Sequence, residues 1–227
     1  MNPNSLRHAP AMAVARPRPY AGRKARERAS RRADVLSAAR RLFARKGYRR
    51  STMVEIAAAA ELALGTLYQL FPSKEAILCR LLEEYIDGLT ERVRGSIEAV
   101  ADPREQLGNI VRAQLAFSEE NADVLRLYLS GWIGYEFTVR QQFGDRIDSA
   151  YEQYLRLLAS VFRRGARLGA FVPEPPRRLA VALAGVIHAV IRRWMRERCD
   201  LVVEGEAVLR LVVDGVTRAR RERAGRR

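Results

Sequence analysis

A capping box at residues 52–55 is the short feature that most constrains how this chain can fold. In the stretch TMVE, the Thr52 hydroxyl and the Glu55 carboxylate can each bind a backbone N–H that the first turn of a helix leaves free. A helix is therefore predicted to begin here, and a break at 61–63 keeps it short. Its inward face is predicted to consist of Met53, Ile56, Ala57 and Ala60.

A second short helix is predicted over 64–70. It must end there because Pro72 cannot continue a helix. Ser73 then caps a long helix that is expected to run from Lys74 to about Gly95. Two short helices joined by a turn of three to four residues form a helix-turn-helix, and the second helix has the size to enter the major groove of DNA, about 12 Å wide. The alternative is three ordinary packed helices.

The rest of the chain also has helical periodicity, and no segment alternates with the period of two that is typical of a strand. Upstream, an apolar face predicts a helix from Ser30 that Gly47 ends as a C-terminal cap. Residues 1–28 are predicted to be a flexible basic arm, because they are rich in proline and lack periodicity. Further helices are predicted over roughly 103–119, 121–140, 145–168, 176–198 and 204–222. The predicted fold class is all-α.

Positive charge is concentrated at one end of the chain. Residues 1–50 hold fifteen Lys and Arg against Glu27 and Asp34, which accounts for +13 of the net charge of +15. A polyanion is the natural partner, either a nucleic acid or an anionic membrane surface. The basic stretch 16–32 either reaches along the minor groove of DNA or is a solvated tail that adds only nonspecific attraction.

Other classes of protein find little support in the sequence. It contains no nucleophile elbow, phosphate loop, dinucleotide-binding glycine pattern or cluster of metal ligands, so we expect no enzyme, no cofactor and no metal site. His188 is interpreted as a core or interface residue. Cys79 and Cys199 are far apart in the chain and are interpreted as inert thiols in a reducing compartment rather than redox sensors. No apolar run approaches the ~18 residues of a membrane span, so a cytoplasmic protein without a membrane partner is expected.

Residues 33–78 read ADVLSAARRLFARKGYRRSTMVEIAAAAELALGTLYQLFPSKEAIL. This stretch resembles the N-terminal domain of the TetR/AcrR family of bacterial transcription repressors. The residues that carry the resemblance are Phe43, Gly47, Tyr48, Thr52, Ile56, Ala57, Ala60, Gly65, Thr66, Leu67, Tyr68, Phe71, Ser73 and Lys74.

The resemblance implies a helix-turn-helix DNA-binding domain at 29–75 and a helical effector-binding and dimerisation domain at 76–227. It also implies a sequence-specific regulator, a homodimeric repressor that a small-molecule effector releases from a near-palindromic DNA operator. A nonspecific binder of nucleic acid or of an anionic membrane surface, driven by the basic arm, is the alternative.

The same resemblance implies which residues contact DNA. Thr52, at a helix N-terminus, and Lys74 are expected to bind phosphates. Gln69 is expected to read a base, because its amide can pair bidentately with adenine. The full predicted set is Arg50, Ser51, Thr52, Leu64, Gly65, Thr66, Tyr68, Gln69 and Lys74.

Three residues depart from the family pattern. Glu61 stands in the turn where the family usually has glycine, and a positive φ there would cost a non-glycine residue ~1 kcal/mol or more. Ala63 replaces the usual serine cap, which removes a contribution of ~1 kcal/mol. Leu64 places an apolar side chain where the family often has a polar one, and it either meets a thymine methyl group or packs against the protein.

Aromatic residues in the second half of the chain predict an effector pocket. Tyr128, Trp132 and Tyr135 are spaced to share one helix face, which is more often core, but the resemblance implies an inducer cavity in this domain. The expected effector is an apolar or aromatic small molecule, with Glu136 as countercharge if it is cationic. The predicted pocket consists of Phe117, Tyr128, Trp132, Tyr135, Glu136, Tyr151 and Tyr154.

The last two predicted helices form the candidate dimer surface. The helix over 176–198 is apolar around much of its circumference, so it must be buried on more than one side, and a second copy of the chain is the expected second partner. Two-fold symmetry would then place the two recognition helices about 34–36 Å apart. The predicted interface residues are Leu183, Ile187, Ile191, Trp194, Leu209, Val212 and Val216.

Overall fold

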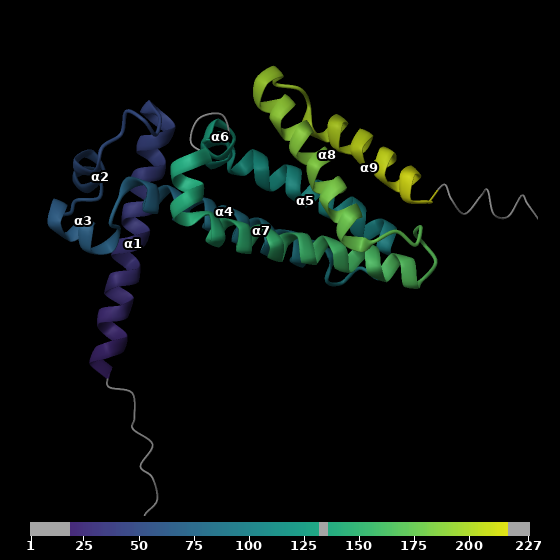
Figure 1. Ribbon diagram of the computed structural model, residues 1–227, viewed down its shortest axis with the longest axis horizontal. Helices are drawn as coiled ribbons and strands as arrows, with labels where there is room; N and C mark the ends of the chain where they lie inside the picture. The colour runs from purple at the N-terminus through teal and green to yellow at the C-terminus, as the bar shows by residue number, and fades with distance from the viewer. Residues whose placement is uncertain (1–18, 132–135, 218–227) are drawn as a thin grey trace, which may run out of the picture.

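The computed structural model describes residues 19–131 and 136–217, and every regular element within these ranges is a helix (Figure 1). The predicted all-α fold is therefore confirmed. The helices are α1 (Pro19–Lys46), α2 (Met53–Ala59), α3 (Leu64–Leu70), α4 (Lys74–Ile97), α5 (Pro103–Glu120), α6 (Ala122–Gly131), α7 (Glu136–Arg167), α8 (Pro176–Glu197) and α9 (Leu201–Thr217).

Side-chain caps define the ends of the short helices, as the sequence predicts. The Thr52 hydroxyl accepts a hydrogen bond from the backbone N–H of Glu55 at 3.3 Å, and the Glu55 carboxylate accepts one from the backbone N–H of Thr52. The Ser73 hydroxyl accepts the backbone N–H of Ala76 at 3.2 Å and so starts α4. Gly47 follows the last residue of α1 with a φ of 84°, a conformation that favours glycine.

Helix α1 begins at Pro19, earlier than the predicted start at Ser30, so residues 19–28 of the predicted flexible arm are helical. The reason is local. Proline fits the first turn of a helix, and most of the residues that follow are alanines, arginines and a lysine, which have high helix propensity. An ion pair between Arg23 and Glu27, one turn apart at 3.6 Å, adds to this.

Two further helices differ from their predicted bounds. Helix α7 starts at Glu136, earlier than the predicted start at residue 145, and α6 is described as far as Gly131, because residues 132–135 lie outside the described residues. Helix α9 starts at Leu201 instead of residue 204, because the Asp200 carboxylate accepts the backbone N–H of Val202 at 2.8 Å and caps the earlier turn.

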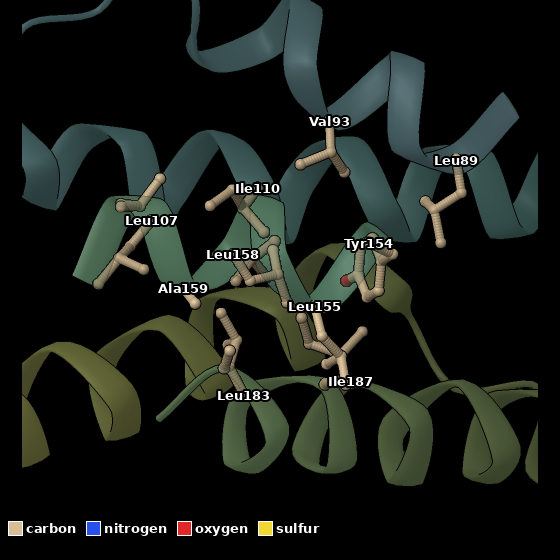
Figure 2. Close-up of a cluster of buried hydrophobic side chains, with 14 of the residues drawn as sticks. Leu89, Val93, Leu107, Ile110, Tyr154, Leu155, Leu158, Ala159, Leu183 and Ile187 are labelled. Atoms are coloured by element: carbon tan, nitrogen blue, oxygen red, sulfur yellow. The ribbon is translucent and has the colours of Figure 1, made fainter. Parts of the chain in front are cut away.

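The described side chains form two hydrophobic cores. The smaller core joins α1, α2, α3 and the first turns of α4 up to Leu82, and Val124 of α6 also packs into it. The larger core joins α4 from Ile86 onward with α5, α7, α8 and α9. Figure 2 shows part of the larger core, with Leu89, Val93, Leu107, Ile110, Tyr154, Leu155, Leu158, Ala159, Leu183 and Ile187. Helix α4 is thus a shared structural element of both cores.

Candidate nucleic-acid interface

Helix α3 has one buried and one exposed face. Leu67 and Leu70 are buried in the smaller core. Gly65 and Gln69 are exposed, and Tyr68 is 49% exposed. A Cβ at Gly65 would meet no atom within 4 Å, so a DNA backbone can approach α3 closely at this point. With Leu64, the exposed face therefore carries four of the predicted contact residues, whose binding to DNA stays a prediction.

The turn before α3 and the start of α3 contain the three residues that depart from the family pattern. Glu61 has a φ of 55°, the left-handed conformation that normally favours glycine. Ala63, at the N-cap position, makes no side-chain hydrogen bond. Leu64 is 38% exposed, so the first residue of α3 offers an apolar contact at the surface instead of packing inside.

Two predicted contact residues are bound to the protein itself. Ser51 is buried and its hydroxyl donates to the carbonyl of Gly47 at 2.8 Å. The Lys74 ammonium donates to the carbonyls of Tyr48 at 3.0 Å and Ser51 at 2.8 Å, and it lies 4.4 Å from the centre of the Tyr48 ring. These bonds hold the segment between α1 and α2 against α4. The structure therefore contradicts a DNA contact by the Ser51 side chain, and it leaves Lys74 one donor for a phosphate.

The Glu55 carboxylate lies at the N-terminus of α2, where Thr52 is predicted to bind phosphate. It forms an ion pair with the Lys46 ammonium and accepts the backbone N–H of Thr52 at 2.9 Å. These bonds, first that from Lys46 and then those from Thr52, lower the pKa of Glu55 to about 2. The end of α2 thus already carries a negative charge. Thr52 and Arg50 are exposed, and their phosphate contacts stay predictions.

A groove between α1 and α3 is the part of this surface that the sequence analysis missed. Its volume is about 340 Å³, and it is lined by Lys24, Glu27, Arg28, Arg31, Thr66, Gln69 and Leu70. Lys24, Arg28 and Arg31 are four and three residues apart, so they share one face of α1. This spacing is visible in the sequence, but it is informative only if a helix begins before Ser30.

Comparison with known proteins identifies the family. The sequence model of the family described as "Bacterial regulatory proteins, tetR family" matches residues 35–81. The chain is also 27% identical to the HTH-type transcriptional repressor KstR2 of Mycobacterium tuberculosis, over 83% of this chain and 94% of that protein. The chain thus matches the tetR family of bacterial regulatory proteins over residues 35–81 and is similar to a repressor over most of its length. It is thus a DNA-binding transcriptional regulator.

Solved structures share the fold of this regulator along almost their whole length. The transcriptional regulator FadR from Bacillus subtilis, in complex with stearoyl-CoA, aligns with a TM-score of 0.71 and 25% identity, covering 81% of this chain and 98% of FadR. A protein from Saccharomonospora viridis described as a transcriptional regulator, in complex with choline, aligns with a TM-score of 0.71 and 23% identity, covering 83% of this chain and 98% of its own.

Two tyrosines of the predicted effector pocket lie side by side on α7. Tyr154 is fully buried, its hydroxyl donates to the side-chain carbonyl of Gln114, and burial raises its pKa. Tyr151 is half-buried, with its ring 6.0 Å from that of Tyr154 and stacked on His188 at 6.1 Å. Burial, and after it the charge of Arg192, lowers the pKa of His188, which favours the neutral imidazole. Tyr154 is thus a core residue with a satisfied hydroxyl, and Figure 2 shows it among the apolar side chains of the larger core.

The remaining pocket residues are only partly described. The Phe117 ring lies 5.3 Å from that of Tyr85, whose hydroxyl is 3.2 Å from the Ser118 hydroxyl. The helix face that Tyr128, Trp132 and Tyr135 are predicted to share stays a prediction. Trp132 and Tyr135 lie outside the described residues, as do the side chains of Tyr128 and Glu136.

Most of the predicted dimer residues are buried within the chain itself. Leu183, Ile187 and Ile191 of α8 and Val216 of α9 belong to the larger core, so their prediction as interface residues is wrong. The reason is that α8 packs on α5, α7 and α9 of the same chain, which accounts for its broad apolar surface. Trp194, Leu209 and Val212 are half-buried against the same core. The exposed large apolar residues of α8 and α9 are Val181, Val202, Val203 and Leu211.

The described residues also bear on metal binding and on membrane insertion. Within residues 19–131 and 136–217, no group of three or more His, Cys, Asp or Glu side chains is arranged to hold a metal ion. In the same ranges no single helix is long and apolar enough to cross a membrane, and α2 with α3 meets that criterion of length and composition only as a pair bent by 100°.

Proposed function

We propose that this tetR-family regulator is a homodimeric repressor that binds a near-palindromic operator and is released by a small, largely apolar effector. The observation that carries the proposal is the arrangement of α3. Leu67 and Leu70 fix the helix in the core, while Gly65, Tyr68 and Gln69 face outward and can reach base edges or phosphates. The similar protein KstR2 is a transcriptional repressor.

The proposed effector has an apolar body and a polar head. In support of this, the larger core and the side chains packed against it contain aromatic rings with polar ends: Tyr85 comes from α4, Tyr154 and Tyr151 come from α7, and Tyr151 stacks on His188 of α8. Such side chains suit a ligand that is mostly apolar with few polar groups. Two proteins of the same fold, in complex with stearoyl-CoA and with choline, suggest these two compounds as first probes.

Two ion pairs provide a route from the effector region to the DNA-binding helices. The Arg40 guanidinium on α1 binds both oxygens of Asp123 on α6, at 2.6 and 2.7 Å, and lowers the pKa of that carboxyl group. Glu83, buried on α4 between the two cores, accepts Arg146 of α7 at 2.7 and 2.9 Å. An effector that displaces α6 or α7 would therefore pull on α1 and α4 and move the two recognition helices out of register.

The test of the proposed function begins with selection of bound duplexes from a random-sequence DNA library by the full-length chain. The selected duplex is then competed with excess random DNA. A specific repressor keeps its operator, whereas a nonspecific nucleic-acid or membrane-surface binder loses it. Stearoyl-CoA and choline are then titrated into the complex separately. Failure to enrich any sequence would overturn the proposed operator binding, and retention of the operator at saturating effector would overturn release by that compound.

The proposed dimer leads to a prediction at Gly185. This residue is exposed on α8, a Cβ there would meet no atom within 4 Å, and it lies one turn after Val181 on the outer face. Gly185→Leu should raise the dimer dissociation constant at least about tenfold by preventing close approach of two α8 helices, with circular dichroism unchanged. Analytical ultracentrifugation measures the constant. Gly95→Leu is the matched control, at an exposed glycine of α4 that is equally open. Equal constants for the two variants would argue against a dimer through α8.

A further inference from the structure

The N-terminal half of α1 extends beyond the helix-turn-helix. Figure 1 shows this end of the helix projecting away from α2 and α3. All described side chains from residue 22 to residue 31 are exposed. Residues 19–33 contain six Lys and Arg and a single acidic residue, Glu27. This part of α1 makes little contribution to either core, so packing does not explain why it is helical and basic.

The basic side chains continue the inward face of the helix. Further along α1, Val35 and Ala39 are buried on the face that packs against the other helices of the smaller core. Lys24, Arg28 and Arg31 precede them at spacings of three and four residues, so they lie along nearly the same side of the helix. One side of α1 is thus apolar where it packs in the smaller core. Nearer the N-terminus, beyond that core, the same side is basic and faces the groove beside α3.

Arg32 joins α1 to the end of α3. Its guanidinium donates to the carbonyl of Leu70 at 2.6 Å and lies 4.2 Å from the centre of the Phe71 ring. Both contacts are at the end of α3, so they hold α1 against it, and Leu70, which accepts the Arg32 bond, also lines the groove of about 340 Å³ described above. Thr66 and Gln69, on the exposed side of α3, line the same groove as Lys24 and Arg28. The basic face of α1 is therefore continuous with the predicted DNA-reading surface.

We propose that this basic face of α1 binds the DNA backbone beside each half-site, with Lys24, Arg28 and Arg31 on successive phosphates. The proposal rests on the proposed operator binding and extends it beyond the helix-turn-helix. The three residues span about 10 Å along the helix, over which one DNA strand presents about three phosphates. Such contacts add affinity and fix the orientation of α3 on the duplex but carry no sequence information.

The test replaces all three side chains by glutamine, as K24Q/R28Q/R31Q, because glutamine retains helix propensity and removes the charge. With the selected duplex, the plot of log K against log salt should become shallower by about 2 to 3 for each bound protomer. Affinity for a scrambled duplex should fall by a similar factor, so the specificity ratio is retained. Hydroxyl-radical footprinting should lose protection of the backbone flanking each half-site.

The matched control is R156Q/R163Q/R167Q, three exposed arginines of α7, which removes the same charge away from α3. This control should keep the salt dependence and the footprint of the unaltered chain. An unchanged salt slope in the α1 variant, or an equal change in the control, would overturn the backbone contact while leaving operator binding intact. If the unaltered chain selects no sequence, the proposed function fails and the α1 contact fails with it.

Discussion

Replacing Leu67 with alanine should lower the free energy of unfolding by about 3 kcal/mol, because Leu67 is completely buried and its loss leaves a cavity under α3. The helix is only seven residues long and its start lacks a side-chain cap, so it depends on tertiary packing for its stability. Urea unfolding followed by circular dichroism measures the change. A loss below about 1 kcal/mol would mean that α3 is not held by this side chain.

The adjacent residue should behave in the opposite way. Tyr68 is 49% exposed, so Tyr68→Ala should change stability by less than about 0.5 kcal/mol. Its affinity for the selected duplex should nevertheless fall at least about tenfold, since a side chain at the centre of the outer face is removed. Both variants are compared in the same urea and DNA-binding assays. Tyr68→Ala with the affinity of the unaltered chain would contradict the assignment of α3 as the reading helix.

Gly165→Ala should be the most damaging glycine substitution in the larger core. A Cβ at this position of α7 would lie 2.0 Å from Cδ2 and 2.3 Å from Cε2 of Phe171. Phe171 is buried and its ring lies 5.9 Å from that of Phe162, so it has little freedom to move away. Overpacking of this kind costs about 1–3 kcal/mol, and the upper part of this range is expected here. Thermal and urea unfolding both report it.

Gly95→Ala is the control for this substitution. It also adds a methyl group in a helix, but at an exposed position where nothing lies within 4 Å. It should stabilise the chain by about 0.5–1 kcal/mol, because alanine loses less backbone entropy than glycine on forming a helix. The two variants should therefore change stability in opposite directions. If Gly165→Ala were as stable as Gly95→Ala, the close contact between α7 and Phe171 would be refuted.

Features decided by a few neighbouring residues were predictable from the sequence. The capping box at Thr52, the cap at Ser73 and the uncapped start of α3 at Ala63 are as predicted, and Glu61 has the left-handed φ that the family pattern implies. Each cap is a hydrogen bond between a side chain and a backbone N–H group only a few residues away, so the local sequence shows whether that bond can form.

Features decided by tertiary partners were not predictable. The helix over residues 19–28 is missed for a different, local reason: its basic, proline-containing composition also indicates disorder, although arginine and alanine favour helices. The apolar residues around α8 indicate that several helices pack against it, but they do not show which helices these are. Leu183 and Ile187 are therefore predicted to contact a second chain, whereas they contact helices of the same chain. The family resemblance implies a phosphate contact for Lys74 but not its bonds to the protein, because the carbonyls that accept them belong to residues more than twenty positions away.

The passage of α4 through both cores has a thermodynamic consequence. Its first turns complete the smaller core and its later turns the larger one, so neither core can lose α4 without exposing apolar side chains of the other. The helix-turn-helix and the effector region are therefore expected to melt in one cooperative transition. Any ligand of the larger core will then raise the melting temperature of the DNA-binding helices as well, even though it touches none of them.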